Sequence, residues 1–143
     1  MQALCKLAKT YAPLAGRVLI TFIFLRSAYW KMFELTAVSE MMAKKGMPFP
    51  EFLLAGAIAF EIAGGLMVLF GWHARIGALL LAIFLVAATL IFHNFWAVDP
   101  AQLSGQLNHF LKNLTILGAL VFIIGMGSGP LSLKEEGKSP GEC

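Results

Sequence analysis

Long apolar runs separated by short polar connections dominate the chain. Three of them, at 14–33, 52–70 and 75–95, have about the length of 20 residues that an α-helix needs to cross a bilayer. A fourth run lies at 107–126, where polar residues precede a pure apolar stretch. The pattern therefore predicts an all-α integral membrane bundle of four transmembrane helices, formed by residues 1–143 as a single domain.

The connections between these runs are short. Residues Thr36–Lys45 combine apolar and polar positions and predict a short amphipathic helix in the membrane interface, between the first and second spans. The C-terminal residues 133–143 are polar and too few to fold alone, so we expect a tail. Glycine, proline and polar residues predict a tight turn, a polar loop and a helix terminator, at Gly71–His73, Val98–Gly105 and Gly125–Pro130.

Composition supports the membrane class. The chain has 143 residues, of which 59% are hydrophobic and 13% are charged, whereas a soluble domain carries about 25% charged residues. The net charge of +3 is too small and too scattered for a nucleic-acid partner. The two cysteines lie at opposite ends of the sequence, which does not match the spacing of a metal site.

Lysine and arginine positions predict the orientation of the helices. The side with both termini carries five of these residues against three on the other side, so the positive-inside rule favours cytoplasmic termini and a cytoplasmic tail. The five are Lys6, Lys9, Arg75, Lys134 and Lys138, and the three are Lys31, Lys44 and Lys45. Arg17 and Arg75 are interpreted as interface anchors.

Glu61 lies in the middle of the apolar run Phe52–Phe70. A carboxylate at the bilayer centre costs roughly 2.5–3.5 kcal/mol, so it must be paired, protonated or in contact with water. Arg26 is the predicted partner, because both residues lie deep in their spans and carry opposite charges. Such a pair could equally be structural and fix the register of the helices.

The other polar groups gather in the half of the bundle away from the termini. We predict that Glu61, His93, Lys112 and Asn113 face one pocket, with Arg26 and Lys31 as further candidates. It would suit a ligand with a polar head and an apolar body, such as a quinone, or a small anion. The alternatives are that Lys31 and Lys112 reach to the interface, that His93 caps its helix, and that Asn113 forms an interhelical hydrogen bond.

Two histidines raise the question of a haem or a metal. His93 and His109 lie at similar depth on successive spans and could supply two axial ligands. There is no second pair of ligands and no shell of carboxylates, so we expect no metal and consider haem a weak alternative.

Several segments together resemble the DoxX family of small bacterial integral membrane proteins, from about Ala15 to Leu133. They are GRVLITFIFLRSAYWKM, KKGMPFPEFLLAGAIAFEIAGGLMVLFGWHARIGALLLA, FHNFW, HFLKNLTILGALV and GSGPLSL. The resemblance implies a four-helix protein of the bacterial inner membrane. Some members of the family are subunits of a thiosulfate:quinone oxidoreductase, and others are linked to membrane redox complexes. The motif positions are Lys31, Glu61, Gly64, Gly65, Arg75, His93, Lys112 and Asn113.

These observations predict an accessory or small subunit of a quinone-linked membrane redox system, with membrane or periplasmic redox proteins as partners. Whether the chain is an enzyme, and whether it forms oligomers, stays open. One alternative is a non-enzymatic membrane scaffold. Another is a small transporter that uses Glu61, although broken helices or inverted repeats, which that function favours, are not evident.

Overall fold

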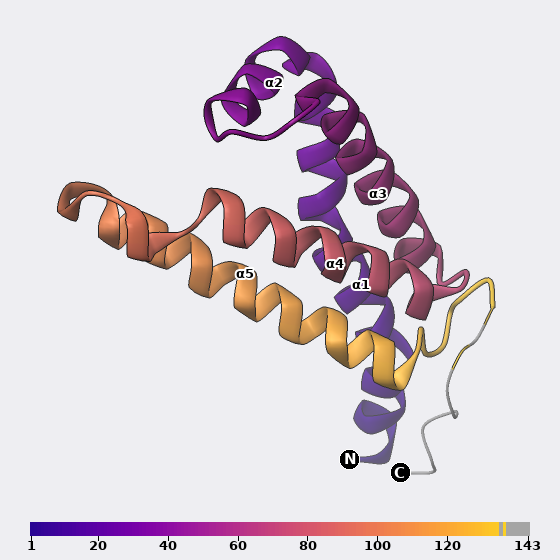
Figure 1. The fold of residues 1–143 in the computed structure, drawn as a ribbon. Coiled ribbons are helices and arrows are strands. Elements are labelled where there is room, and N and C mark those ends of the chain that lie inside the picture. The colour runs from indigo at the N-terminus through magenta and orange to yellow at the C-terminus, as the bar shows by residue number, and fades with distance from the viewer. Residues whose placement is uncertain (135, 137–143) are drawn as a thin grey trace.

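The computed structural model describes residues 1–134 and 136, which form helices joined by short connections, with no strand among them (Figure 1). Four of the helices are long and apolar enough to cross a membrane. The predicted all-α membrane bundle is therefore confirmed. The elements are α1 (Gln2–Phe33), α2 (Leu35–Lys44), α3 (Pro50–Phe70), α4 (Ala74–Phe92), the short 3-10 helix η1 (Phe95–Ala97) and α5 (Pro100–Met126).

Helices α3 and α4 lie close to the predicted spans, whereas α1 and α5 are longer. Helix α1 starts at Gln2, and its 32 residues give a length of about 48 Å, more than the hydrocarbon core requires. Helix α5 starts at Pro100, so the predicted loop at 98–105 is mostly wrong. Asp99 occupies the N-cap position and Pro100 the first helical turn, which both residue types favour.

The predicted connections are otherwise present. A helix, α2, does lie between the first two spans. Gly71 and His73 adopt positive φ angles of 65° and 50° and form the tight turn between α3 and α4. Helix α5 ends at Met126, and Gly127 follows it with φ 86°. The predicted tail lies mostly outside the described residues.

The helices pack as two antiparallel pairs. Helix α1 packs on α3, α3 on α4, and α4 on α5. Figure 1 shows that the α4–α5 pair crosses the α1–α3 pair at a wide angle, with α2 at the far end from the N-terminus. The main core contains Val68, Leu81 and Leu120, which are fully buried. A smaller apolar cluster joins Val38 and Met42 of α2 to Leu54 of α3.

Two adjacent glycines allow α3 to approach a helix on each side. A Cβ atom on Gly64 would lie 2.9 Å from the carbonyl oxygen of Gly77 on α4. A Cβ atom on Gly65 would lie 2.9 Å from a methyl carbon of Leu25 on α1. Small residues let membrane helices approach to backbone contact. At the Gly64-Gly65 pair α3 therefore lies close to both α1 and α4.

Arg17 fastens the segment after α5 to the bundle, a role that its interpretation as an interface anchor did not include. Its side chain is only 2% exposed. Its Nη2 atom donates hydrogen bonds to the carbonyl oxygens of Pro130 (3.1 Å) and Leu131 (2.7 Å). The backbone N–H of Leu133 then donates to Phe70 O at 2.9 Å, so the segment after α5 lies along the α3–α4 turn.

We expect Gly64→Ala to lower the free energy of unfolding by about 1–3 kcal/mol, because the added methyl group meets a backbone oxygen that cannot rotate away. The matched control is Gly118→Ala on α5, where a Cβ atom has nothing within 4 Å. Unfolding in detergent by heat or by sodium dodecyl sulfate measures the difference. Equal stability of the two variants would contradict the close α3–α4 contact.

Candidate functional site

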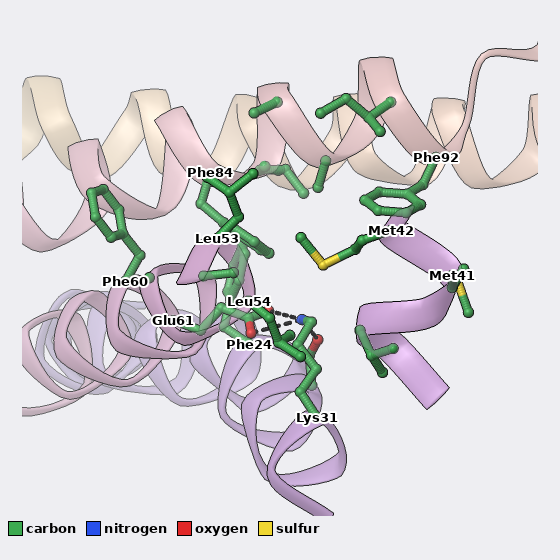
Figure 2. Close-up of a pocket in the computed structure, with 18 of the residues that line it drawn as sticks. Phe24, Lys31, Met41, Met42, Leu53, Leu54, Phe60, Glu61, Phe84 and Phe92 are labelled. Atoms are coloured by element: carbon green, nitrogen blue, oxygen red, sulfur yellow. Dashed lines mark hydrogen bonds and ion pairs between the residues drawn. The ribbon is translucent and has the colours of Figure 1, made fainter. Parts of the chain in front are cut away.

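Glu61 pairs with Lys31. The Lys31 Nζ atom lies 2.7 Å from Glu61 Oε2 and 2.9 Å from Oε1, so both carboxylate oxygens accept a hydrogen bond. The Glu61 side chain is 1% exposed and the Lys31 side chain 15%. Figure 2 shows the two side chains joined by dashed lines, with Phe24 and Leu54 close by. The pair links α1 to α3 within the span.

Every hydrogen-bond donor of the Lys31 ammonium has an acceptor nearby. Ser27 lies one helical turn before it, and the Ser27 Oγ atom accepts a hydrogen bond from Nζ at 2.6 Å. The three N–H groups of the ammonium therefore all have acceptors. The ring of Phe84, on α4, lies 5.1 Å from Nζ and adds a cation–π contact. The lysine is thus held by groups from α1, α3 and α4.

The predicted Arg26–Glu61 pair is wrong. Arg26 is exposed, and the carboxylate of Glu61 has Lys31 as its cation. Helical geometry explains this: Phe24 and Ala28 are buried in the bundle, and a residue two positions from each is turned by about 200° to the opposite face. The i, i+4 spacing of Ser27 and Lys31, next to the buried positions, is the signal that could have identified the true partner.

A cavity of about 580 Å³ opens beside the ion pair, between the two helix pairs and under α2. Figure 2 shows Phe84 and Phe92 on one side, Glu61 and Lys31 on the other, and Met42 between them. All five helices contribute to its lining, which is largely apolar. The polar and charged residues that line it are Ser27, Lys31, Glu61, His93 and Asn113.

The cavity brings together part of the predicted site. Glu61, His93 and Asn113 line it, and Lys31 does too. Lys112 and Arg26 are not among its lining residues, and both are exposed. Lys112 is one residue from Asn113, so the turn of the helix directs it to another face of α5. The binding role of these residues stays a prediction.

The contribution of α2 to the cavity was not predicted from the sequence. Met41 and Met42, together with Met47 in the following turn, line the cavity, and Met42 is buried against Leu54. Methionine side chains are flexible and adapt to irregular apolar shapes. The methionines within the predicted amphipathic helix were the available signal, since an amphipathic segment can cover a cavity as well as lie on a membrane surface.

His93 lies at the end of α4 and contacts two residues of α5. Its Nδ1 atom is 3.0 Å from Gln106 Oε1. Its ring stacks on that of His109, with centroids 4.9 Å apart and planes 18° apart. Two axial ligands of a haem point nitrogen atoms at an iron between them, whereas these rings lie face to face. The arrangement does not fit a haem bound by this pair.

Asn113 ties α5 to α4. Its Nδ2 atom donates a hydrogen bond to Thr89 Oγ1 at 2.9 Å, and Thr89 Oγ1 donates to the carbonyl oxygen of Leu85 at 2.6 Å. Thr89 is buried in the bundle. Asn113 is therefore an interhelical hydrogen-bonding residue that also reaches the cavity, as the alternative interpretation of its sequence position anticipated.

Comparison with known proteins settles the family. The sequence model of DoxX matches residues 12–94, which is more than half of the chain. The chain belongs to the DoxX family. The matched residues include both partners of the ion pair, the Gly64-Gly65 pair and His93. Most of the cavity therefore belongs to the part of the chain that the DoxX model describes.

Two relatives from Escherichia coli (strain K12) match along most of their length. The chain is 25% identical to inner membrane protein YphA over 126 residues, which cover 88% of this chain and 90% of YphA. It is 31% identical to inner membrane protein YqjF over 120 residues, which cover 84% of this chain and 87% of YqjF. Together with the four apolar helices, these relatives identify a multi-pass inner-membrane protein.

A eukaryotic protein is also similar. The Surfeit locus protein 4 homolog of Schizosaccharomyces pombe is 28% identical over 132 residues, covering 91% of this chain but only 39% of that protein. No solved structure matches the chain significantly.

Removing one partner of the Lys31–Glu61 ion pair should lower the stability of the protein. Glu61→Gln leaves the Lys31 ammonium buried without a counter-charge, which costs about 3–5 kcal/mol of stability. The double variant Lys31→Met, Glu61→Leu removes both charges and should recover most of that loss. Unfolding in detergent measures the stability of the wild type, of Glu61→Gln and of the double variant.

Arg26→Met serves as the matched control, since Arg26 is an exposed cation on the same helix. We expect it to leave stability unchanged in the wild type and to give no recovery in the Glu61→Gln background. Two results would contradict the Lys31–Glu61 pairing. One is recovery of stability when Arg26→Met is added to Glu61→Gln, and the other is a Lys31/Glu61 double variant whose loss of stability equals the sum of the two single losses.

Proposed function

We propose that the protein is an accessory subunit of a quinone-linked membrane redox system and that its cavity binds a molecule with a polar head and an apolar body, of the quinone type. The observation that carries this proposal is the composition of the cavity. Its volume of about 580 Å³ lies in the range of small-molecule sites, and its walls are mostly Phe, Met, Leu and Ile with a few polar groups.

The polar groups of the cavity divide into two sets. The N–H groups of Lys31 are engaged with Glu61 and Ser27, so the ion pair has no donor left for a ligand. His93 and Asn113 retain hydrogen-bonding capacity. Because Gln106 Oε1 accepts from His93 Nδ1, the neutral ring presents Nε2 as an acceptor.

Asn113 supplies the complementary chemistry. One N–H of its amide is bonded to Thr89, which leaves a second N–H and the carbonyl oxygen. An oxidised quinone carbonyl could accept from Asn113, and a reduced quinol hydroxyl could donate to His93. The pair therefore suits both redox states of one head group, while Phe84, Phe92 and Met42 suit an apolar body.

We further propose that both termini lie in the cytoplasm. Lys6 and Lys9 precede the span-forming part of α1, and Arg75 lies at the α3–α4 turn at the same end of the bundle (Figure 1). Lys138 lies outside the described residues. The cavity and α2 lie at the other end, so in this orientation the cavity opens toward the periplasmic half of the membrane.

The orientation predicts the behaviour of reporter fusions. Alkaline phosphatase, which requires the periplasm, should be active after Val98 and inactive after Lys134. Green fluorescent protein, which requires the cytoplasm, should show the reverse pattern. Active phosphatase after Lys134 would invert the proposed orientation.

Binding of a short-chain quinone should quench the fluorescence of Trp30, which lines the cavity. The measurement uses a variant with Trp72→Phe and Trp96→Phe, so that Trp30 is the sole tryptophan. We expect saturable quenching that His93→Phe weakens several-fold, because phenylalanine keeps the ring but lacks the acceptor. Gly56→Leu, which places a side chain in open space at the cavity wall, should lower affinity about tenfold or more.

Gly118→Leu is the matched control, because its Cβ also meets open space but Gly118 does not line the cavity. It should bind the quinone like the starting protein. Absence of saturable quenching would overturn the proposed function and favour the scaffold alternative. Equal affinity in the Gly56→Leu and Gly118→Leu variants would show that the quinone binds elsewhere.

A further inference from the structure

A second groove, of about 610 Å³, lies between α1 and α5 at the end of the bundle that carries the N-terminus. The two helices have little direct contact along it. On α1 its wall is a face of small residues, Ala8, Ala12 and Gly16, each one helical turn from the next. A Cβ atom on Gly16 would meet nothing within 4 Å, so the groove is open there.

Arg17 lines the same groove, and its charged side chain is buried. Its Nη atoms donate to the carbonyl oxygens of Leu69, Pro130 and Leu131, which are neutral acceptors. Its Nε atom is buried and has no hydrogen-bond partner. Within residues 1–134 and 136, no carboxylate forms a salt bridge with it. Buried charges are normally paired with an opposite charge, and the described part of the chain offers Arg17 none.

The groove has a polar end and an apolar end. Lys9, Arg17 and Ser128 lie toward the chain termini, whereas Ile20, Ala119 and Phe122 lie deeper along the spans. Arg17 bonds to Leu69 and Pro130, which flank the ends of α3 and α5, so it lies near the membrane surface. The polar end is therefore at the depth of lipid phosphates, and the apolar end is at the depth of acyl chains.

We propose that this groove binds one anionic phospholipid from the leaflet that meets the chain termini. The phosphate lies beside Arg17, where it supplies a negative charge that no salt bridge within the described residues provides, and Lys9 brings a second positive charge to the same end of the groove. One acyl chain follows the small-residue face of α1 past Ile20 and packs on Phe122 of α5. The site is separate from the cavity beside Glu61, so it does not depend on the proposed quinone-type ligand.

The test titrates the full-length protein in dodecyl maltoside micelles with dioleoyl phosphatidylglycerol, with dioleoyl phosphatidylcholine, or with inorganic phosphate. Native mass spectrometry counts the bound lipids, and the thermal midpoint reports their effect on stability. We expect one phosphatidylglycerol per chain, bound about tenfold more tightly than phosphatidylcholine, with a raised thermal midpoint. Inorganic phosphate should not reproduce the rise.

The variants locate the site. Gly16→Leu fills the groove and should abolish the tight phosphatidylglycerol binding, whereas Gly118→Leu, the matched control outside the groove, should retain it. Lys9→Gln lowers the charge at the polar end without filling the groove, and it should weaken the preference for phosphatidylglycerol several-fold. Circular dichroism confirms that each variant is folded, and Lys9→Gln still tests the proposal if Gly16→Leu does not fold.

Three outcomes would overturn the proposal. Equal retention of the two phospholipids would show that Arg17 serves only to hold the C-terminal segment. An equal stabilisation by inorganic phosphate would assign the site to a free anion instead of a lipid. Wild-type affinity and selectivity in Gly16→Leu would show that the lipid binds outside this groove.

Discussion

A carboxylate within a membrane span needs a cation or a proton, because the surrounding hydrocarbon cannot solvate its charge. Glu61 meets this constraint through Lys31, and the pair sets the register of α1 against α3. Moving along α3 toward the termini, Gly65 meets Leu25 and the carbonyl oxygen of Leu69 meets Arg17. One antiparallel seam therefore runs from the ion pair to the clamp on the C-terminal segment.

The ion pair also uses its own hydrogen-bonding groups within the wall of the cavity. Its oxygen and nitrogen atoms bond to one another and to Ser27, so they stabilise the wall of the cavity without presenting a donor to a ligand. His93 and Asn113 reach the cavity from the α4–α5 pair, which the Gly64 contact joins to α3. The wide crossing of the two helix pairs leaves the space, and α2 covers it. This arrangement explains how a charged pair and a largely apolar cavity can lie side by side in a membrane.

Sequence patterns predicted the features that depend on length and periodicity, and they failed where three-dimensional packing decides. The apolar runs predicted four spans, and the Gly71 turn was placed correctly, because both depend on local chemistry. Arg26 was wrongly predicted as the partner of Glu61 in place of Lys31, because the prediction used depth and charge and did not consider which face of the helix each residue occupies. The burial of Arg17 was missed since its partners are backbone carbonyl oxygens more than fifty residues away, which carry no signal in their side chains. The contribution of α2 to the cavity was missed for a different reason. Its amphipathic pattern shows that one face is apolar but does not show what that face covers.

The most direct test of this account is the distance between the two charges that join α1 and α3. Solid-state nuclear magnetic resonance of the protein in lipid bilayers, with ¹⁵N-labelled lysine and arginine and ¹³C-labelled glutamate, measures the dipolar coupling between side-chain nitrogen and carboxyl carbon. We expect a strong coupling from a lysine Nζ to the Glu61 carboxyl that Lys31→Met and Glu61→Gln each remove. A coupling of the Glu61 carboxyl to an arginine that survives Lys31→Met would contradict it.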